Sequence, residues 1–155
     1  MILNSNAFLD GGTIPQLHAM TTVGGRNVSL PFEWQDPPQG TESFVLTVVD
    51  PHAVANNWIH WMVINIPPGV DYLEEGASGS RMPAGCRELK NTFSSVGYGG
   101  PQPPPGTGLH PYVCTLFAVS VPALEVPEKI TAGDLERFLA GKILSRAVIA
   151  GFYKT

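Results

Sequence analysis

Glycine and proline set the tightest limit on what this chain can fold into. The 155 residues include 17 glycines and 15 prolines, whereas average usage is about 7% and about 5%. Both residues are unfavourable inside helices, so a helix bundle is excluded. Hydrophobic residues still make up 43% of the chain, which is enough to build a core and argues against disorder. The composition therefore predicts one turn-dense, mostly β domain over residues 1–155.

Runs of β-branched and aromatic residues, separated by turn-forming residues, predict the strands. The expected strands are Asn27–Trp34, Ser43–Asp50, Trp58–Ile66, Tyr112–Val121 and Ser145–Tyr153. Trp58–Ile66 is nearly apolar on both of its faces. We therefore expect it to be the central strand of the sheet, next to both 43–50 and 112–120.

One helix is expected, over Thr131–Ile143. Thr131 suits the N-cap position, because Asp134 follows three residues later in a near capping box. Residues 70–90 are expected to form a loop with one short strand, and the Gly- and Pro-rich residues 91–111 a long loop. Several strands with short turns and one late helix indicate a β-sandwich or Greek-key domain.

The charge distribution excludes several classes of partner. Nine basic residues are scattered singly among thirteen acidic ones, for a net charge of −4. Without a basic cluster, neither nucleic-acid binding nor anchoring on an anionic membrane is expected. No apolar run approaches the roughly 18 residues that a membrane span needs, so stable membrane insertion is not expected either.

The N-terminal segment and the cysteines bear on the cellular compartment. Residues 1–12 have neither the basic region nor the apolar region of a secretory signal. Cys86 and Cys114 lack metal-type spacing and are too few for a disulfide framework. One disulfide is conceivable, but two independent thiols are the favoured interpretation. These features predict a cytoplasmic protein.

Three polar residues lie at the ends or middles of apolar strands. Asp50 ends one expected strand, His60 lies within the next, and His110 precedes a third. Each of them alone has a common structural role, but together they converge if these strands are neighbours. A carboxylate beside two imidazoles keeps them cationic or fixes their tautomers, so that their N–H groups face an anion. Burial would lower the imidazole pKa and Asp50 would raise it, and the sequence leaves that balance open.

Four groups of residues form an ordered set of motifs. They are Asp50-Pro51-His52-Ala53, Trp58-Ile59-His60-Trp61, Asn91-Thr92-Phe93 with the run from Gly97 to Tyr112, and Gly151-Phe152-Tyr153-Lys154. With these motifs the chain resembles the phosphatidylethanolamine-binding protein (PEBP) family, in its bacterial and archaeal Raf-kinase-inhibitor-like branch. It departs from the family patterns DPDAP and HRY, because His52 replaces the second aspartate, Val54 the last proline, and Pro111 the arginine.

The resemblance implies a fold, a site and a class of partner. It implies a β fold with a large central sheet, a smaller sheet and a short C-terminal helix. It also implies a pocket for a small anion or phospholipid headgroup: phosphate, phosphoryl-ethanolamine or a carboxylate. The matching site residues are Asp50, Trp58, His60, Gly100, Pro101, His110 and Tyr112. Members of the family look like modulators or inhibitors of kinases or proteases rather than catalysts, with no cofactor. A kinase or protease is therefore an expected candidate partner. A homodimer is a separate candidate, and the sequence leaves the oligomeric state open.

Three alternative functions stay open at this point. Asp50, His52, His60 and His110 contain the elements of a two-His-one-carboxylate metal site, as in a metal-dependent enzyme. A serine hydrolase would need a nucleophile motif, and the stretch around Ser78 lacks the closing glycine of G-x-S-x-G. The third alternative is a structural or interaction protein with a vestigial pocket.

Overall fold

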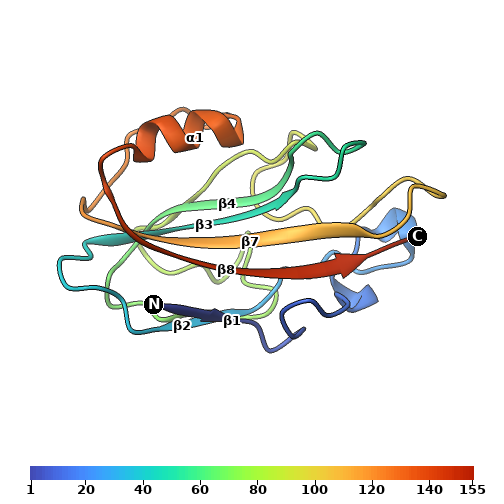
Figure 1. Ribbon diagram of the computed structural model, residues 1–155, viewed down its shortest axis with the longest axis horizontal. Coiled ribbons are helices and arrows are strands. Elements are labelled where there is room, and N and C mark those ends of the chain that lie inside the picture. Colours follow the sequence, from blue (N-terminus) through green and yellow to red (C-terminus); the bar gives the residue numbers. More distant parts are fainter.

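The computed structural model describes all residues, 1–155, and is mainly β, with two antiparallel sheets and one α-helix (Figure 1). Its strands are β1 (Ile2–Asn4), β2 (Phe32–Gln35), β3 (Ser43–Asp50), β4 (Trp58–Ile66), β5 (Tyr72–Leu73), β6 (Arg87–Glu88), β7 (His110–Val119) and β8 (Ile143–Tyr153). The helix α1 spans Ala132–Leu139, and two short 3-10 turns cover Gln16–His18 and Thr21–Val23. The small sheet has the order β1-β2-β5, and the large sheet has the order β6-β4-β3-β7-β8.

The two sheets and the helix enclose two hydrophobic cores. In Figure 1 the small sheet lies against one face of the large sheet, and α1 covers part of the other face. Phe32, Phe44 and Trp61 belong to the core between the sheets. Met62 and Leu139 belong to the core beneath the helix. The predicted β fold of a large sheet, a smaller sheet and a late helix is therefore confirmed.

The central strand of the large sheet is β3, which lies between β4 and β7. Strand β4 therefore pairs with β3 as expected, but the expectation that β4 is the central strand and also lies next to β7 was wrong. The outer edge of β4 pairs with only the two residues of β6. The irregular segment 89–99 continues along that edge, where Thr92 N–H donates to the Ile59 carbonyl and Gly99 N–H donates to the His60 carbonyl. The strand is nevertheless apolar on both faces, because one core lies on each side of it.

Several element bounds differ from the expected ones. The chain becomes a strand at Phe32 instead of Asn27, because Asn27 has a φ of +53° and Pro31 has no N–H to donate. The helix begins after Thr131, in the expected capping box with Asp134, but it ends at Leu139 instead of Ile143. Gly141, with a φ of +73°, turns the chain directly into β8. Strand β7 begins two residues earlier than expected, and residues 70–90 contain two short strands instead of one.

One end of the large sheet gathers the residues that the sequence singled out. Strand β3 ends at Asp50, which pairs with Trp58 at the start of β4, and β7 begins nearby at His110. The loops 51–57 and 101–109 lie at this end, close to the C-terminus (Figure 1). No helix of the chain combines the length and the apolar character needed to cross a bilayer.

Candidate functional site

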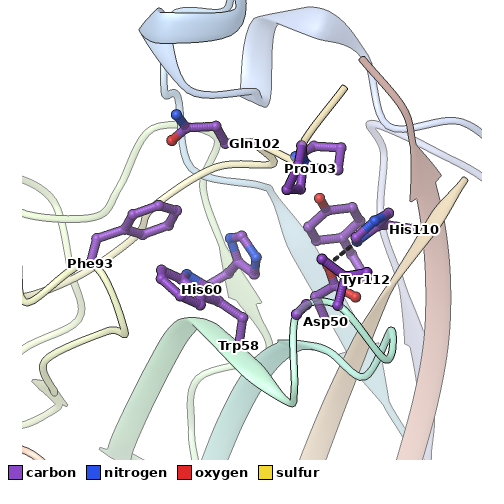
Figure 2. Close-up of a pocket in the computed structure, with 11 residues that line it drawn as sticks. Asp50, Trp58, His60, Phe93, Gln102, Pro103, His110 and Tyr112 are labelled. Atoms are coloured by element: carbon purple, nitrogen blue, oxygen red, sulfur yellow. Dashed lines mark hydrogen bonds and ion pairs between the residues drawn. The ribbon is translucent and has the colours of Figure 1, made fainter. Parts of the chain in front are cut away.

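A cavity of about 390 Å³ opens at this end of the large sheet. Its wall consists of Asp50, Val54, Ala55, Trp58, His60, Phe93, Gln102, Pro103, Pro104, His110 and Tyr112. Figure 2 shows strand residues below the cavity and Gln102 and Pro103 above it. Five of the seven expected site residues therefore lie together in one wall, and Gly100 and Pro101 do not.

Asp50 and His110 form a buried pair. Asp50 is 2% exposed and His110 is fully buried, and Asp50 Oδ2 lies 2.6 Å from His110 Nδ1 (dashed in Figure 2). The other carboxylate oxygen, Oδ1, accepts the backbone N–H of His52 at 2.9 Å. Both oxygens of the carboxylate are thus used inside the protein. The ring nitrogen Nδ1 carries the hydrogen, because the carboxylate accepts it.

The second ring nitrogen of His110 is also occupied. His110 Nε2 lies 2.9 Å from Thr107 Oγ1, and that hydroxyl also lies 2.6 Å from the Pro104 carbonyl. A carbonyl only accepts, so the hydroxyl gives its single hydrogen to Pro104 and must accept from Nε2. Both ring nitrogens are then protonated, and His110 is an imidazolium paired with the Asp50 carboxylate.

The order Thr107, His110, Asp50 has the spacing of a nucleophile, base and acid triad. An imidazolium cannot take a proton from the hydroxyl, however, and Thr107 is not part of the cavity wall. The arrangement instead ties the loop 101–109 to the end of β3. It contains a buried ion pair between the His110 imidazolium and the Asp50 carboxylate.

The metal-site alternative has no support in the geometry. No group of three or more His, Cys, Asp or Glu side chains is placed to hold a metal ion. The rings of His52 and His110 stack with centroids 3.8 Å apart, so their nitrogens do not converge on one point. His110 Nδ1 is taken by Asp50 and His60 Nδ1 lies 2.6 Å from the Gly99 carbonyl.

His60 differs from His110 in its protonation. The residue is 3% exposed, and burial lowers its pKa from 6.5 to about 4, against the weaker opposing effects of the Gly99 carbonyl, Asp50 and the Gly100 backbone. Burial therefore dominates the balance that the sequence left open, and the ring is neutral at pH 7. Its single hydrogen is on Nδ1, because the Gly99 carbonyl accepts it. The expectation that His60 and His110 both offer N–H groups to an anion is not met, because the protein itself uses those groups.

Two other groups in the wall have no partner. The Tyr112 hydroxyl and the Trp58 indole N–H are both buried, and neither gives its hydrogen to an acceptor of the protein. Burial, and after it the neighbouring Asp50 carboxylate, raises the pKa of Tyr112, so its hydroxyl keeps the hydrogen. Such groups cost free energy when they stay unpaired in a protein interior. The cavity wall thus contains two unused donors.

Gly100 and Pro101 have structural roles outside the cavity wall. A Cβ at Gly100 would lie 2.0 Å from the His18 carbonyl oxygen, so only glycine fits there. The Gly100 N–H donates to the Asn27 side chain, and the Pro101 carbonyl accepts from the Met20 N–H. Both residues fasten the long loop to the N-terminal segment, which places Gly99 beside His60.

The sequence reasoning missed six residues of the wall. They are Val54, Ala55, Phe93, Gln102, Pro103 and Pro104. Most of them stand inside the motifs that carry the resemblance, which was the available signal. Phe93 packs edge-on against Trp58 and His60, and the prolines close the opposite side.

Comparisons with known proteins agree with this fold and these motifs. The family model described as "Phosphatidylethanolamine-binding protein" matches residues 4–154. A UPF0098 protein of Aquifex aeolicus is 39% identical over 150 residues, which cover 97% of this chain and 86% of the relative. A relative from Mycobacterium tuberculosis that is named a lipoprotein, LppC, is 33% identical over 99% of this chain and 72% of its own length.

The crystal structure of YbcL from Escherichia coli, described as a member of the mammalian PEBP family, is similar throughout. It has a TM-score of 0.92 and 30% sequence identity, and the alignment covers 99% of this chain and 98% of YbcL. The match of the family model over nearly the whole sequence agrees with this similarity. The chain therefore belongs to the phosphatidylethanolamine-binding protein family.

Proposed function

We propose that this protein binds a small anion, such as phosphate, phosphoryl-ethanolamine or a carboxylate, in the cavity at the end of β3, β4 and β7. The observation that carries the proposal is the pair of buried, unpartnered donors, the Tyr112 hydroxyl and the Trp58 indole N–H. Anionic oxygens would give both groups the hydrogen bonds that the protein does not supply. The cavity volume of about 390 Å³ lies in the usual range for small-ligand sites.

The electrostatics of the wall favour selectivity over tight binding. No lysine or arginine lines the cavity, and the Asp50 carboxylate is neutralised by His110. The anion would be held by neutral dipoles of buried side chains, whose hydrogen bonds to a charged oxygen are stronger than in water. We expect a modest affinity with little dependence on salt concentration.

Isothermal titration with inorganic phosphate tests the proposal. Tyr112→Phe removes one hydrogen bond to a charged oxygen, so phosphate should bind about ten- to hundred-fold more weakly. His18→Gln is the matched control, because His18 is a buried histidine outside the cavity whose Nδ1 contacts the Val28 carbonyl. The control should bind phosphate like the wild type. No binding by the wild-type protein, or equal binding by Tyr112→Phe, would contradict the proposal.

The proposal includes a modulating role toward a kinase or protease instead of catalysis. It is supported by the family membership and by the position of Thr107, whose hydroxyl hydrogen is committed to Pro104. Hydrolysis of p-nitrophenyl esters or phosphates that is lost in Thr107→Val would contradict it. Inhibition of a purified kinase or protease of the same host, in a reaction with defined components, would support it.

A cytoplasmic location is the remaining part of the proposal. Cys86 and Cys114 are both free thiols, as expected in a reducing compartment. The lipoprotein name of one relative points to the cell envelope for that protein. Fractionation of cells that express the natural gene, followed by immunoblotting, separates the two locations.

A further inference from the structure

The His60 ring presents a hydrogen-bond acceptor to the cavity. Its Nδ1 donates to the Gly99 carbonyl across 2.6 Å, and the ring is neutral, so Nε2 carries a lone pair and no hydrogen. No group of the protein donates a hydrogen bond to Nε2, although the residue is only 3% exposed. Figure 2 shows the ring between Phe93 and Tyr112, in the cavity wall.

The surrounding residues do not change this assignment. The charged groups nearest to His60 are Asp50 on β3 and His110 on β7, and they neutralise each other as a pair. On the remaining sides, the aromatic rings of Phe93 and Tyr112 meet His60 edge-on, with centroids 5.6 and 4.9 Å away. The carbonyls of Gly99 and Gly100 also act on the ring and favour its protonation, but burial outweighs them and keeps the ring neutral.

A ligand must match both kinds of group in this wall. Tyr112 and Trp58 need acceptor oxygens, whereas His60 Nε2 needs a hydrogen from the ligand. A fully deprotonated oxygen facing that lone pair would leave a buried acceptor unpaired, which is costly. A phosphomonoester monoanion carries both features at once, because its second pKa is about 6. Sulfate and phosphodiesters carry no hydrogen on their oxygens near neutral pH.

We propose that His60 makes the site selective for an anion that carries its own acidic hydrogen, hydrogen phosphate or a phosphomonoester monoanion, over sulfate or a phosphodiester. This inference rests on the proposed function, because it concerns the same cavity. Selectivity comes from an acceptor that only the correct anion can satisfy, not from the overall charge of the ligand.

Titration calorimetry of the wild-type protein with methyl phosphate, dimethyl phosphate and sulfate gives the first test. At pH 5.5 His60 is neutral and most of the methyl phosphate carries its hydrogen. Sulfate and dimethyl phosphate should bind about ten- to hundred-fold more weakly than methyl phosphate. Equal binding of all three anions would overturn the inference and leave anion binding intact, whereas no binding of any would defeat the proposed function itself.

A pH series distinguishes a hydrogen-bond acceptor at His60 Nε2 from a site that attracts anions by charge alone. Between pH 5.5 and pH 8 methyl phosphate loses its hydrogen, so its affinity should fall about ten-fold or more. Sulfate does not titrate in this range, and its affinity reports any change in the protein. The affinity for methyl phosphate is compared with that for sulfate at each pH. If methyl phosphate binds more tightly at pH 8 than at pH 5.5 relative to sulfate, the inference is overturned.

His60→Gln assigns the selectivity to the residue. The glutamine amide can turn either its NH₂ group or its oxygen toward a ligand, so sulfate and methyl phosphate should bind within about three-fold of each other. His18→Gln loses a similar bond from Nδ1 to a carbonyl and should keep the wild-type ratio. Unchanged selectivity in His60→Gln would overturn the role of His60. The ligand and pH series on the wild type need no variant and stand if His60→Gln fails to fold.

Discussion

The two sides of the cavity each contain a buried histidine, His110 and His60, and the two histidines differ in their hydrogen bonds. On one side, which we call the paired wall, Asp50 and His110 use every hydrogen-bonding atom of their side chains within the protein. On the other side, the open wall, the Trp58 N–H and the Tyr112 hydroxyl are buried without an acceptor, and no group of the protein donates to His60 Nε2 (Figure 2). The hydrogen-bond partners of a side chain, and not its residue type, therefore decide whether it stabilises the fold or is free to bind a ligand. The paired wall is expected to stabilise the fold, and the open wall to bind.

The largest effect is expected from breaking the paired wall. His110→Ala leaves the Asp50 carboxylate buried without a counter-charge, which typically costs about 3–5 kcal/mol. Urea unfolding at pH 7 should therefore show a large loss in the free energy of unfolding. Asp50→Asn is expected to be damaging too, because it leaves the imidazolium of His110 without its anion.

A double variant tests whether charge is the cause. Asp50→Asn combined with His110→Gln removes both charges and keeps polar groups of similar size, so it should be more stable than His110→Ala. The coupling energy of the pair comes from the corresponding double-mutant cycle. If His110→Ala loses less than about 1 kcal/mol, the description of the paired wall is wrong.

The next effect comes from acid and concerns the open wall. The folded protein holds the pKa of His60 near 4, whereas the unfolded value is 6.5. The unfolded chain therefore binds a proton that the folded protein excludes. The free energy of unfolding therefore does not suffer from His60 above pH 6.5. As the pH falls from 6.5 toward 4, proton binding to the unfolded chain lowers it by roughly 3 kcal/mol, at 1.36 kcal/mol per pH unit.

Comparison with His60→Gln isolates this effect. Other groups also titrate between pH 7 and pH 4, so the informative quantity is the difference between the two proteins. Urea unfolding at pH 7, 5.5 and 4 should show a stability that falls more steeply with acid in the wild type than in His60→Gln. Parallel curves for the two proteins would mean that His60 is not a buried neutral base.

Local patterns were enough to predict much of the fold. The strands Ser43–Asp50 and Trp58–Ile66 have the predicted bounds, because β-branched and aromatic runs end at Pro51 and at Pro67. Strand order could not be read in the same way, since both faces of β4 are apolar whether it is central or covered by segment 89–99. That segment has no periodicity, so its hydrogen bonds to β4 leave no trace in the sequence.

The site was predictable in its position but not in its chemistry. Asp50, His60 and His110 meet because their strands are neighbours, as the sequence suggested. Their protonation depends on the Gly99 carbonyl and the Thr107 hydroxyl. These partners come from the long irregular loop, whose path is set by tertiary contacts. Gly100 and Pro101 lie outside the cavity wall although they belong to a motif, because a motif does not say which of its residues face a cavity.

A smaller effect is expected where the paired wall meets the loop. Thr107→Val removes the acceptor for His110 Nε2 and keeps the side-chain shape, so it should cost about 1–2 kcal/mol. ¹⁵N NMR of the imidazole nitrogens checks the cause: in the wild type His110 should show two protonated nitrogens and His60 only one. If His110 also shows one unprotonated ring nitrogen, as His60 should, the assignment of His110 as an imidazolium is wrong.

The smallest effect on stability is expected in the open wall itself. Tyr112→Phe removes only a hydroxyl whose hydrogen has no acceptor in the protein, so the ligand-free variant should unfold within about 1 kcal/mol of the wild type, or be slightly more stable. Phosphate stabilises the folded state by mass action when it binds, so the melting temperature of the wild type should rise with phosphate concentration and that of Tyr112→Phe should rise much less. A ligand-free variant that is strongly destabilised would show that the hydroxyl already has a structural partner. The two walls would then differ in degree only, because both would hold the fold together.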